Sequence, residues 1–196
     1  GIPMEKTSVQ KLAGVLKLLV TITFICNLVA LFLVPGCSRL RSLDELVEGA
    51  LYFSNESSLA VTARMMGYFV SAWQEVWLFG GPYAAVLTSF LLFCGVCTAV
   101  ILWQARRVLD TILAGNTFTF ENAANMRRAA VCCFLISAAA LGRTVWGLCF
   151  YRSLMPLLTY NALFVPIFLM AGLLCMVMSA LFRQAAELKA ENDLTI

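Results

Sequence analysis

RRVLDTILAGNTFTFENAANMRR, residues 106–128, is a polar and basic stretch between two long apolar runs. It opens with the pair Arg106-Arg107 and closes with the pair Arg127-Arg128. Arginine side chains are costly inside lipid and gather in the short loops on the cytoplasmic side of membrane helices. The stretch therefore predicts that the chain leaves a membrane before residue 106 and enters it again after residue 128.

The composition of the whole chain points the same way. Of its 196 residues, 61% are hydrophobic and only 13% are charged, and the mean hydropathy is +0.86. A soluble domain is about half apolar and a quarter charged, so the apolar excess here must face lipid. The net charge of +3 is modest and the basic residues do not cluster on one element, so we expect no direct binding to nucleic acid.

Four segments are long enough to cross a bilayer, since a membrane helix needs about 20 mainly apolar residues. They are predicted at residues 12–34, 82–103, 129–150 and 156–182. The sequence thus predicts an all-α polytopic membrane protein, a four-helix bundle forming one membrane domain over residues 1–196. It leaves an outer segment at 35–81, a loop at 104–128 and a tail at 183–196.

Glycine and proline mark the ends of these spans. Pro35-Gly36 is expected to end the first helix, and Gly80-Gly81 to break the chain before the second. Pro82 suits the first turn of a helix. Pro166 lies inside the fourth span, where we expect it to kink the helix.

The distribution of basic residues predicts the orientation. One side of the membrane is expected to hold Lys6, Lys11, Lys17, Arg106, Arg107, Arg127, Arg128, Arg183 and Lys189. The other side is expected to hold Arg39, Arg41, Arg64 and Arg152. Because cytoplasmic loops carry the excess of Lys and Arg, both termini and the loop at 104–128 are predicted to be cytoplasmic.

The outer segment between the first two spans is long enough for helices of its own. Ser42-Leu43-Asp44-Glu45 has the spacing of a capping box, and Asn55-Glu56-Ser57-Ser58 is typical of a break. After the break, apolar and small residues recur at helical spacing: Thr62, Met66, Phe69, Val70, Trp73 and Trp77. This pattern predicts an amphipathic helix, which would serve as a lid over the bundle or as a sensing surface. Asn55 is a glycosylation acceptor only in a eukaryotic secretory route.

No catalytic or metal-binding group stands out. The chain has no histidine, which removes the commonest general base and a common metal ligand, so we expect no enzymatic activity and neither metal nor cofactor. Cys94 and Cys97 have C-x-x-C spacing, but they fall in the middle of a membrane span, where small residues favour close helix packing. Cys132-Cys133 is interpreted in the same way.

Arg143 is the one charge deep inside a predicted span. A charge at that depth costs about 2.5–3.5 kcal/mol on insertion scales, so it normally faces the bundle or water. Two interpretations stay open: the side chain extends to the outer headgroups, or it is an intramembrane functional residue paired with Glu75, backbone carbonyls, or an acidic lipid or ligand.

The loop at 104–128 has the sequence of a helix, a turn and a second helix. The second span is expected to continue to Leu113, with Gly115 just past its end. Thr119 can cap a new helix whose first turn holds Glu121, which favours the helix dipole. The basic pairs are interpreted either as anchors in anionic headgroups or as part of a docking surface for a cytoplasmic partner.

The loop and the tail together resemble the bacterial domain-of-unknown-function (DUF) 2975 family of small four-span membrane proteins. In the loop the matching residues are Leu109, Ile112, Gly115, Phe118, Thr119, Glu121, Asn122, Met126 and Arg127. In the tail they are Phe182, Arg183, Leu188, Glu191, Asn192, Asp193, Leu194, Thr195 and Ile196. Thr117 departs from the pattern, since proline is common there.

The resemblance implies a gene context and a type of partner, and it implies no particular reaction. Such proteins are often encoded beside a small helix-turn-helix regulator, which implies a sensor or regulatory partner in the bacterial cytoplasmic membrane. The candidate partner-binding residues are Arg107, Phe118, Glu121, Asn122, Arg127, Arg128, Glu191, Asn192 and Asp193. We expect the turn, with a buried Phe118, to pack against residues 191–193.

A second hypothesis is a small transporter, exporter or immunity protein for a lipophilic or anionic compound. Arg143 and the outer lid would form its site. The scarcity of polar residues in the spans argues against ions and sugars as substrates. A homodimer fits either hypothesis, because four spans enclose little interior.

Overall fold

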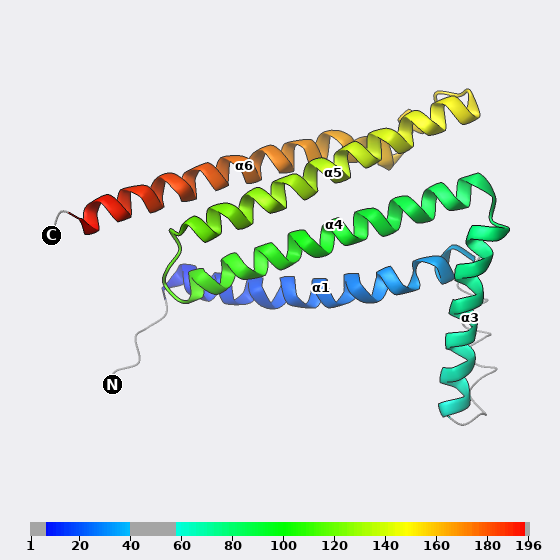
Figure 1. Cartoon of the computed structure of the whole chain (residues 1–196), viewed down its shortest axis with the longest axis horizontal. Coiled ribbons are helices and arrows are strands. Elements are labelled where there is room, and N and C mark those ends of the chain that lie inside the picture. The colour runs from blue at the N-terminus through cyan, green and yellow to red at the C-terminus, as the bar shows by residue number, and fades with distance from the viewer. Residues whose placement is uncertain (1–6, 40–57, 195–196) are drawn as a thin grey trace. The chain divides into compact units, whose positions relative to one another are not determined.

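The computed structural model describes residues 7–39 and 58–194, and these are helical almost throughout (Figure 1). The elements are α1 (Ser8–Arg39), α3 (Ser58–Leu78), α4 (Gly81–Leu113), α5 (Phe120–Tyr151), the short 3₁₀ helix η2 (Met155–Leu158) and α6 (Tyr160–Asp193). The described part of the chain contains no β-strand. The prediction of an all-α fold is confirmed.

Four of these helices, α1, α4, α5 and α6, are long and apolar enough to cross a membrane. Their candidate spans are 27 to 34 residues long, more than the 20 or so that a bilayer requires. The extra length of α4, α5 and α6 belongs to the polar ends beyond the predicted spans. α4 continues through the Arg106-Arg107 pair to Leu113, and α6 continues the last span to Asp193, both as predicted.

Two predicted boundaries are wrong. α1 does not end at Pro35-Gly36 but continues to Arg39, since a proline removes one backbone hydrogen bond while its fixed φ is itself helical. Pro156 lies in η2, and the last long helix begins only at Tyr160. Thr159, with φ −95° and ψ 156°, is extended and separates the two helices.

The chain divides into two compact units: unit 1 comprises Gly1–Leu28 and Cys94–Ile196, and unit 2 comprises Val29–Phe93. Unit 2 contains α3, which confirms a helix after the break. Its buried residues are Ala72 and Val76, whereas Met66, Val70 and Trp77 of the predicted apolar face are largely exposed. The predicted capping box and Asn55 lie outside the described residues.

A tight turn joins α3 to α4 within unit 2, as the two glycines predicted. A Cβ on Gly80 would lie 2.6 Å from the carbonyl oxygen of Val76, so a larger residue would force the backbone apart. Gly81 has a φ of +73°, which side-chain-bearing residues rarely adopt. Pro82 follows in the first turn of α4, as expected.

In unit 1, α1 lies antiparallel to α4. Lys17 forms an ion pair with Asp110 at 2.6 Å, and the rings of Phe24 and Trp103 lie 5.8 Å apart. Further along, the side-chain amide of Asn27 donates to the carbonyl oxygen of Gly95 at 2.9 Å. Along these contacts the residue numbers rise in α1 and fall in α4, and the contacts fix the register of the antiparallel pair.

α5 and α6 run side by side and antiparallel in unit 1 (Figure 1). α5 is the most buried of the four candidate spans. Small residues make up most of its buried face: Ala123, Ala129, Ala130, Cys133, Ser137, Ala140, Thr144 and Gly147. On α6, Gly172 packs so closely that an added Cβ would lie 2.5 Å from the Phe134 ring. This small-residue face was not predicted, although its three- and four-residue spacing is visible in the sequence.

Candidate functional site

The turn between α4 and α5 is closed by backbone hydrogen bonds around a glycine. Gly115 has a φ of +77°, and its N–H donates to the carbonyl oxygen of Ile112 at 3.0 Å. The N–H of Asn116 donates to the carbonyl oxygen of Thr111 at 2.9 Å. These two bonds form a Schellman motif, in which a left-handed residue satisfies the last carbonyls of a helix. The predicted role of Gly115 is confirmed.

Thr119 caps α5 as predicted. Its backbone is extended, with φ −132° and ψ 151°, and its hydroxyl oxygen accepts a hydrogen bond from the N–H of Asn122 at 3.2 Å. Glu121 lies in the first helical turn, where a carboxylate interacts favourably with the positive end of the helix dipole. The start of α5 is therefore fixed by its own sequence.

Asn122 ties the two helices together and is completely buried. Its side-chain amide donates to the hydroxyl oxygen of Thr111 at 2.6 Å and to the carbonyl oxygen of Thr117 at 2.8 Å. This side chain lies inside the turn and not on its surface, so Asn122 positions the turn, and its role in partner binding stays a prediction. Asn122 is the third residue after the cap Thr119, and its amide points back into the turn.

The turn contacts α6, as expected, but at other residues than predicted. The rings of Phe118 and Phe182 lie 6.5 Å apart, and Lys189 donates to the side-chain oxygen of Asn116 at 3.2 Å. Residues 191–193 are exposed instead. Phe118 itself is 53% exposed, so the buried phenylalanine at this contact is Phe182, which packs with Val108 and Ala123.

The remaining candidate residues are all exposed, and together they are called here the turn face. It comprises Arg107, Phe118, Glu121, Arg127 and Arg128 together with Glu191, Asn192 and Asp193 at the end of α6. The turn face is held by a hydroxyl bond between α5 and α6, since Ser179 donates to the carbonyl oxygen of Ala123 at 2.7 Å. α6 extends beyond the start of α5, so its last residues project past the turn (Figure 1).

Charges on the turn face are unevenly neutralised. On the turn face Arg107 pairs with Glu121 at 2.7 Å, and on α6, outside this face, Arg183 pairs with Glu187 at 2.9 Å. These exposed pairs contribute little to stability, but they offset the charges involved. Within residues 7–39 and 58–194, neither Arg127 nor Arg128 makes an ion pair or a hydrogen bond.

Arg143 lies at a polar cluster between α5 and α6, far from the turn face. Its guanidinium donates to the side-chain oxygen of Asn161 at 3.5 Å. The amide of Asn161 in turn donates to the carbonyl oxygen of Ala140 at 3.1 Å and to the hydroxyl of Thr144 at 2.9 Å. Asn161 was not among the predicted partners of Arg143, which were Glu75, backbone carbonyls, or an acidic lipid or ligand, although it is visible as a polar residue in the last span.

The cysteines that the structure describes lie in the four candidate spans. The described cysteines are all free, and Cys97 and Cys133 are buried, as small packing residues would be. Among the described residues, no group of three or more acidic or cysteine side chains has the geometry to hold a metal ion.

The fold and the turn define a helical multi-pass membrane protein. The chain belongs to the family described as protein of unknown function (DUF2975), whose profile matches residues 65–196. This region begins in α3 and includes the whole turn and the tail, so the family resemblance of those two segments is confirmed. Comparison with curated proteins and with solved structures gave no match.

Proposed function

We propose that the protein is a non-enzymatic sensor or regulatory partner of a cytoplasmic helix-turn-helix regulator, embedded in a bacterial cytoplasmic membrane. The turn face would lie in the cytoplasm and bind the regulator. The support for the regulator as partner is the gene context that the family resemblance implies.

The observation that carries the proposal is the construction of the turn. A simple link between two membrane helices needs only basic residues and flexibility. This turn has a Schellman motif at Gly115, a cap at Thr119 and a buried clamp at Asn122, and Lys189 ties it to α6. A surface fixed in this way loses little conformational entropy when a partner binds.

The charge pattern supports the orientation. Arg127 and Arg128 lie at the turn end of unit 1, as does Lys189. An excess of basic residues in short loops favours the cytoplasmic side. A cytoplasmic regulator could then reach the turn face, including the acidic end of α6 at Glu191 and Asp193.

The test is co-purification of the regulator encoded next to the gene with the full-length tagged protein from solubilised membranes. The wild-type protein is expected to retain the regulator. The double charge reversal Glu191→Lys/Asp193→Lys is expected to reduce retention about 10-fold or more, since like charges brought together at an interface cost several kcal/mol.

Leu158→Ala provides the control, because Leu158 is 84% exposed in η2, far along the chain from the turn face. This variant should retain the regulator fully. No retention by the wild-type protein, or full retention by the charge reversal, would overturn the proposal.

The alternative function, transport or export of a lipophilic or anionic compound, would use Arg143. The polar cluster of Arg143, Asn161 and Thr144 between apolar helices is the observation in its favour. Loss of resistance or transport in Arg143→Ala, at unchanged expression and with regulator retention intact, would favour this function.

A further inference from the structure

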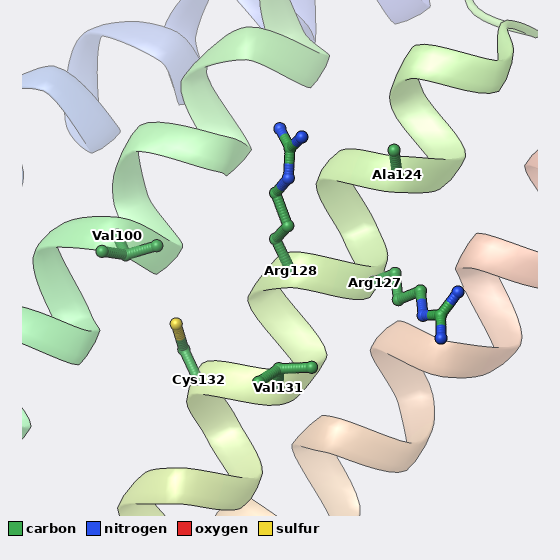
Figure 2. A pocket seen from close by; sticks show the side chains of 6 residues that line it. All are labelled: Val100, Ala124, Arg127, Arg128, Val131 and Cys132. Carbon is green, nitrogen blue, oxygen red and sulfur yellow. The ribbon is translucent and has the colours of Figure 1, made fainter.

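An open groove of about 400 Å³ lies between α4 and α5 in unit 1, near the turn. Its apolar lining comprises Val100 of α4 with Ala124, Val131 and Cys132 of α5 (Figure 2). The two adjacent arginines Arg127 and Arg128 complete it. The groove thus combines an apolar floor with two adjacent cationic residues.

The two arginines point in different directions from the same turn of α5. Figure 2 shows the Arg128 side chain in the space between α4 and α5, with its guanidinium towards the turn, and Arg127 pointing towards α6. Arg127 also lines a second hollow of about 270 Å³ between α5 and α6, together with Ser179 and Arg183. A ligand in the α4–α5 groove therefore meets the guanidinium of Arg128, whereas the guanidinium of Arg127 faces the second hollow.

Neighbouring charges do not compete for these arginines. Three carboxylates on α4, α5 and α6 are engaged with other cations: Glu121 with Arg107, Glu187 with Arg183, and Asp110 with Lys17. Arg127 and Arg128 have no such partner in the part of the chain that the structure describes. Their positive charge is available to an anion from outside the protein.

Their position along α5 fixes the kind of anion. The apolar run of the third span begins at Ala129, directly after Arg128. In a membrane this junction lies at the level of the headgroups, where anionic lipids attract basic side chains. Guanidinium groups match the geometry of phosphate oxygens and bind them in a bidentate manner.

We propose that the groove binds an anionic phospholipid. Its phosphate would lie at the Arg128 guanidinium, with Arg127 adding positive charge at the margin of the groove, and one acyl chain would cover Val100, Val131 and Cys132. A free phosphate ion would leave this apolar floor uncovered. This proposal depends on the membrane setting and not on the proposed regulator.

The test uses the purified full-length protein in detergent micelles, titrated with phosphatidylglycerol and followed by native mass spectrometry. The wild-type protein is expected to retain phosphatidylglycerol in preference to phosphatidylcholine with the same acyl chains. Arg127→Gln/Arg128→Gln is expected to weaken that binding about 10-fold or more. Each basic residue near an anionic lipid surface contributes about 1 kcal/mol to binding, which is roughly fivefold in the dissociation constant.

Lys11→Gln/Arg152→Gln removes two exposed positive charges elsewhere on the protein and is expected to bind phosphatidylglycerol as the wild type does. A separate variant, Val131→Trp, fills the groove without changing the charge and should also weaken binding. Equal binding by the double arginine variant and the wild type would overturn the proposal. So would displacement of the lipid by millimolar inorganic phosphate, which would assign the site to a free anion.

Discussion

The side-chain amide of Asn122 lies 2.6 Å from the hydroxyl oxygen of Thr111, across the turn that joins α4 and α5. The same amide donates to the carbonyl oxygen of Thr117, and the hydroxyl of Thr111 donates to the carbonyl oxygen of Val108 at 2.7 Å. One buried side chain thus connects the end of one helix, the turn and the start of the next. The conformation of the turn face depends on this connection.

Asn122 and Asn125 should respond differently to the same substitution. Both are completely buried, but the amide of Asn125 has no hydrogen-bond partner in the described structure. Asn122→Ala should lower the free energy of unfolding by about 1–3 kcal/mol, because the buried acceptors lose their donor. Asn125→Ala should change it by less than about 1 kcal/mol, because it removes polar atoms that were never satisfied. Denaturant titration in mild detergent measures both; equal losses would contradict the role assigned to Asn122.

Adding a methyl group at Gly172 should weaken the packing of α5 against α6. An added Cβ would lie 2.5 Å from the Phe134 ring, and such overpacking costs about 1–3 kcal/mol. The loss should be partly recovered in Gly172→Ala/Phe134→Leu, measured as a double-mutant cycle of unfolding free energies. Gly142→Ala is the control: nothing lies within 4 Å of its added Cβ, and alanine is the better helix former by about 1 kcal/mol. A stable Gly172→Ala variant would show that the two helices are less closely packed.

Asn161 should stabilise the α5–α6 pair more than Ser137 does. Its amide makes two donor contacts to α5, whereas Ser137 makes one bond to the carbonyl oxygen of Val165. Interhelical hydrogen bonds in membranes contribute on average about 0.6 kcal/mol each. Asn161→Ala should therefore lower the unfolding free energy by about 1 kcal/mol and Ser137→Ala by about half as much. The reverse order would show that the cluster at Arg143 is not held by Asn161.

The charge pattern predicts that both ends of the chain and the turn face the cytoplasm. A fluorescent protein fused to the C-terminus should fluoresce in bacteria, and alkaline phosphatase at the same place should be inactive, since each folds on one side only. A reporter inserted after Asn116, which lies in the turn, should behave identically. Active phosphatase at either site would reverse the proposed orientation and remove the regulator as a possible partner.

Much of the turn followed from local sequence. Gly115 and Thr119 were recognisable because a left-handed residue and a helix cap need particular side chains within a few positions. The burial of Asn122 was not recognisable, because it depends on the distance between α4 and α5. The contact of Phe118 with Phe182, rather than with residues 191–193, was not recognisable either, because it depends on the register of α6 along α5.

The sequence by itself determined that this is a four-span helical membrane protein with a capped turn, because apolar length and turn chemistry act over short distances along the chain. Only the tertiary structure decided which side chains meet. The bond from Asn161 to α5, the fit of Gly172 against Phe134 and the groove beside Arg128 each require two helices at a set register. Registers arise from close packing of whole helix faces, which no single segment of the sequence specifies.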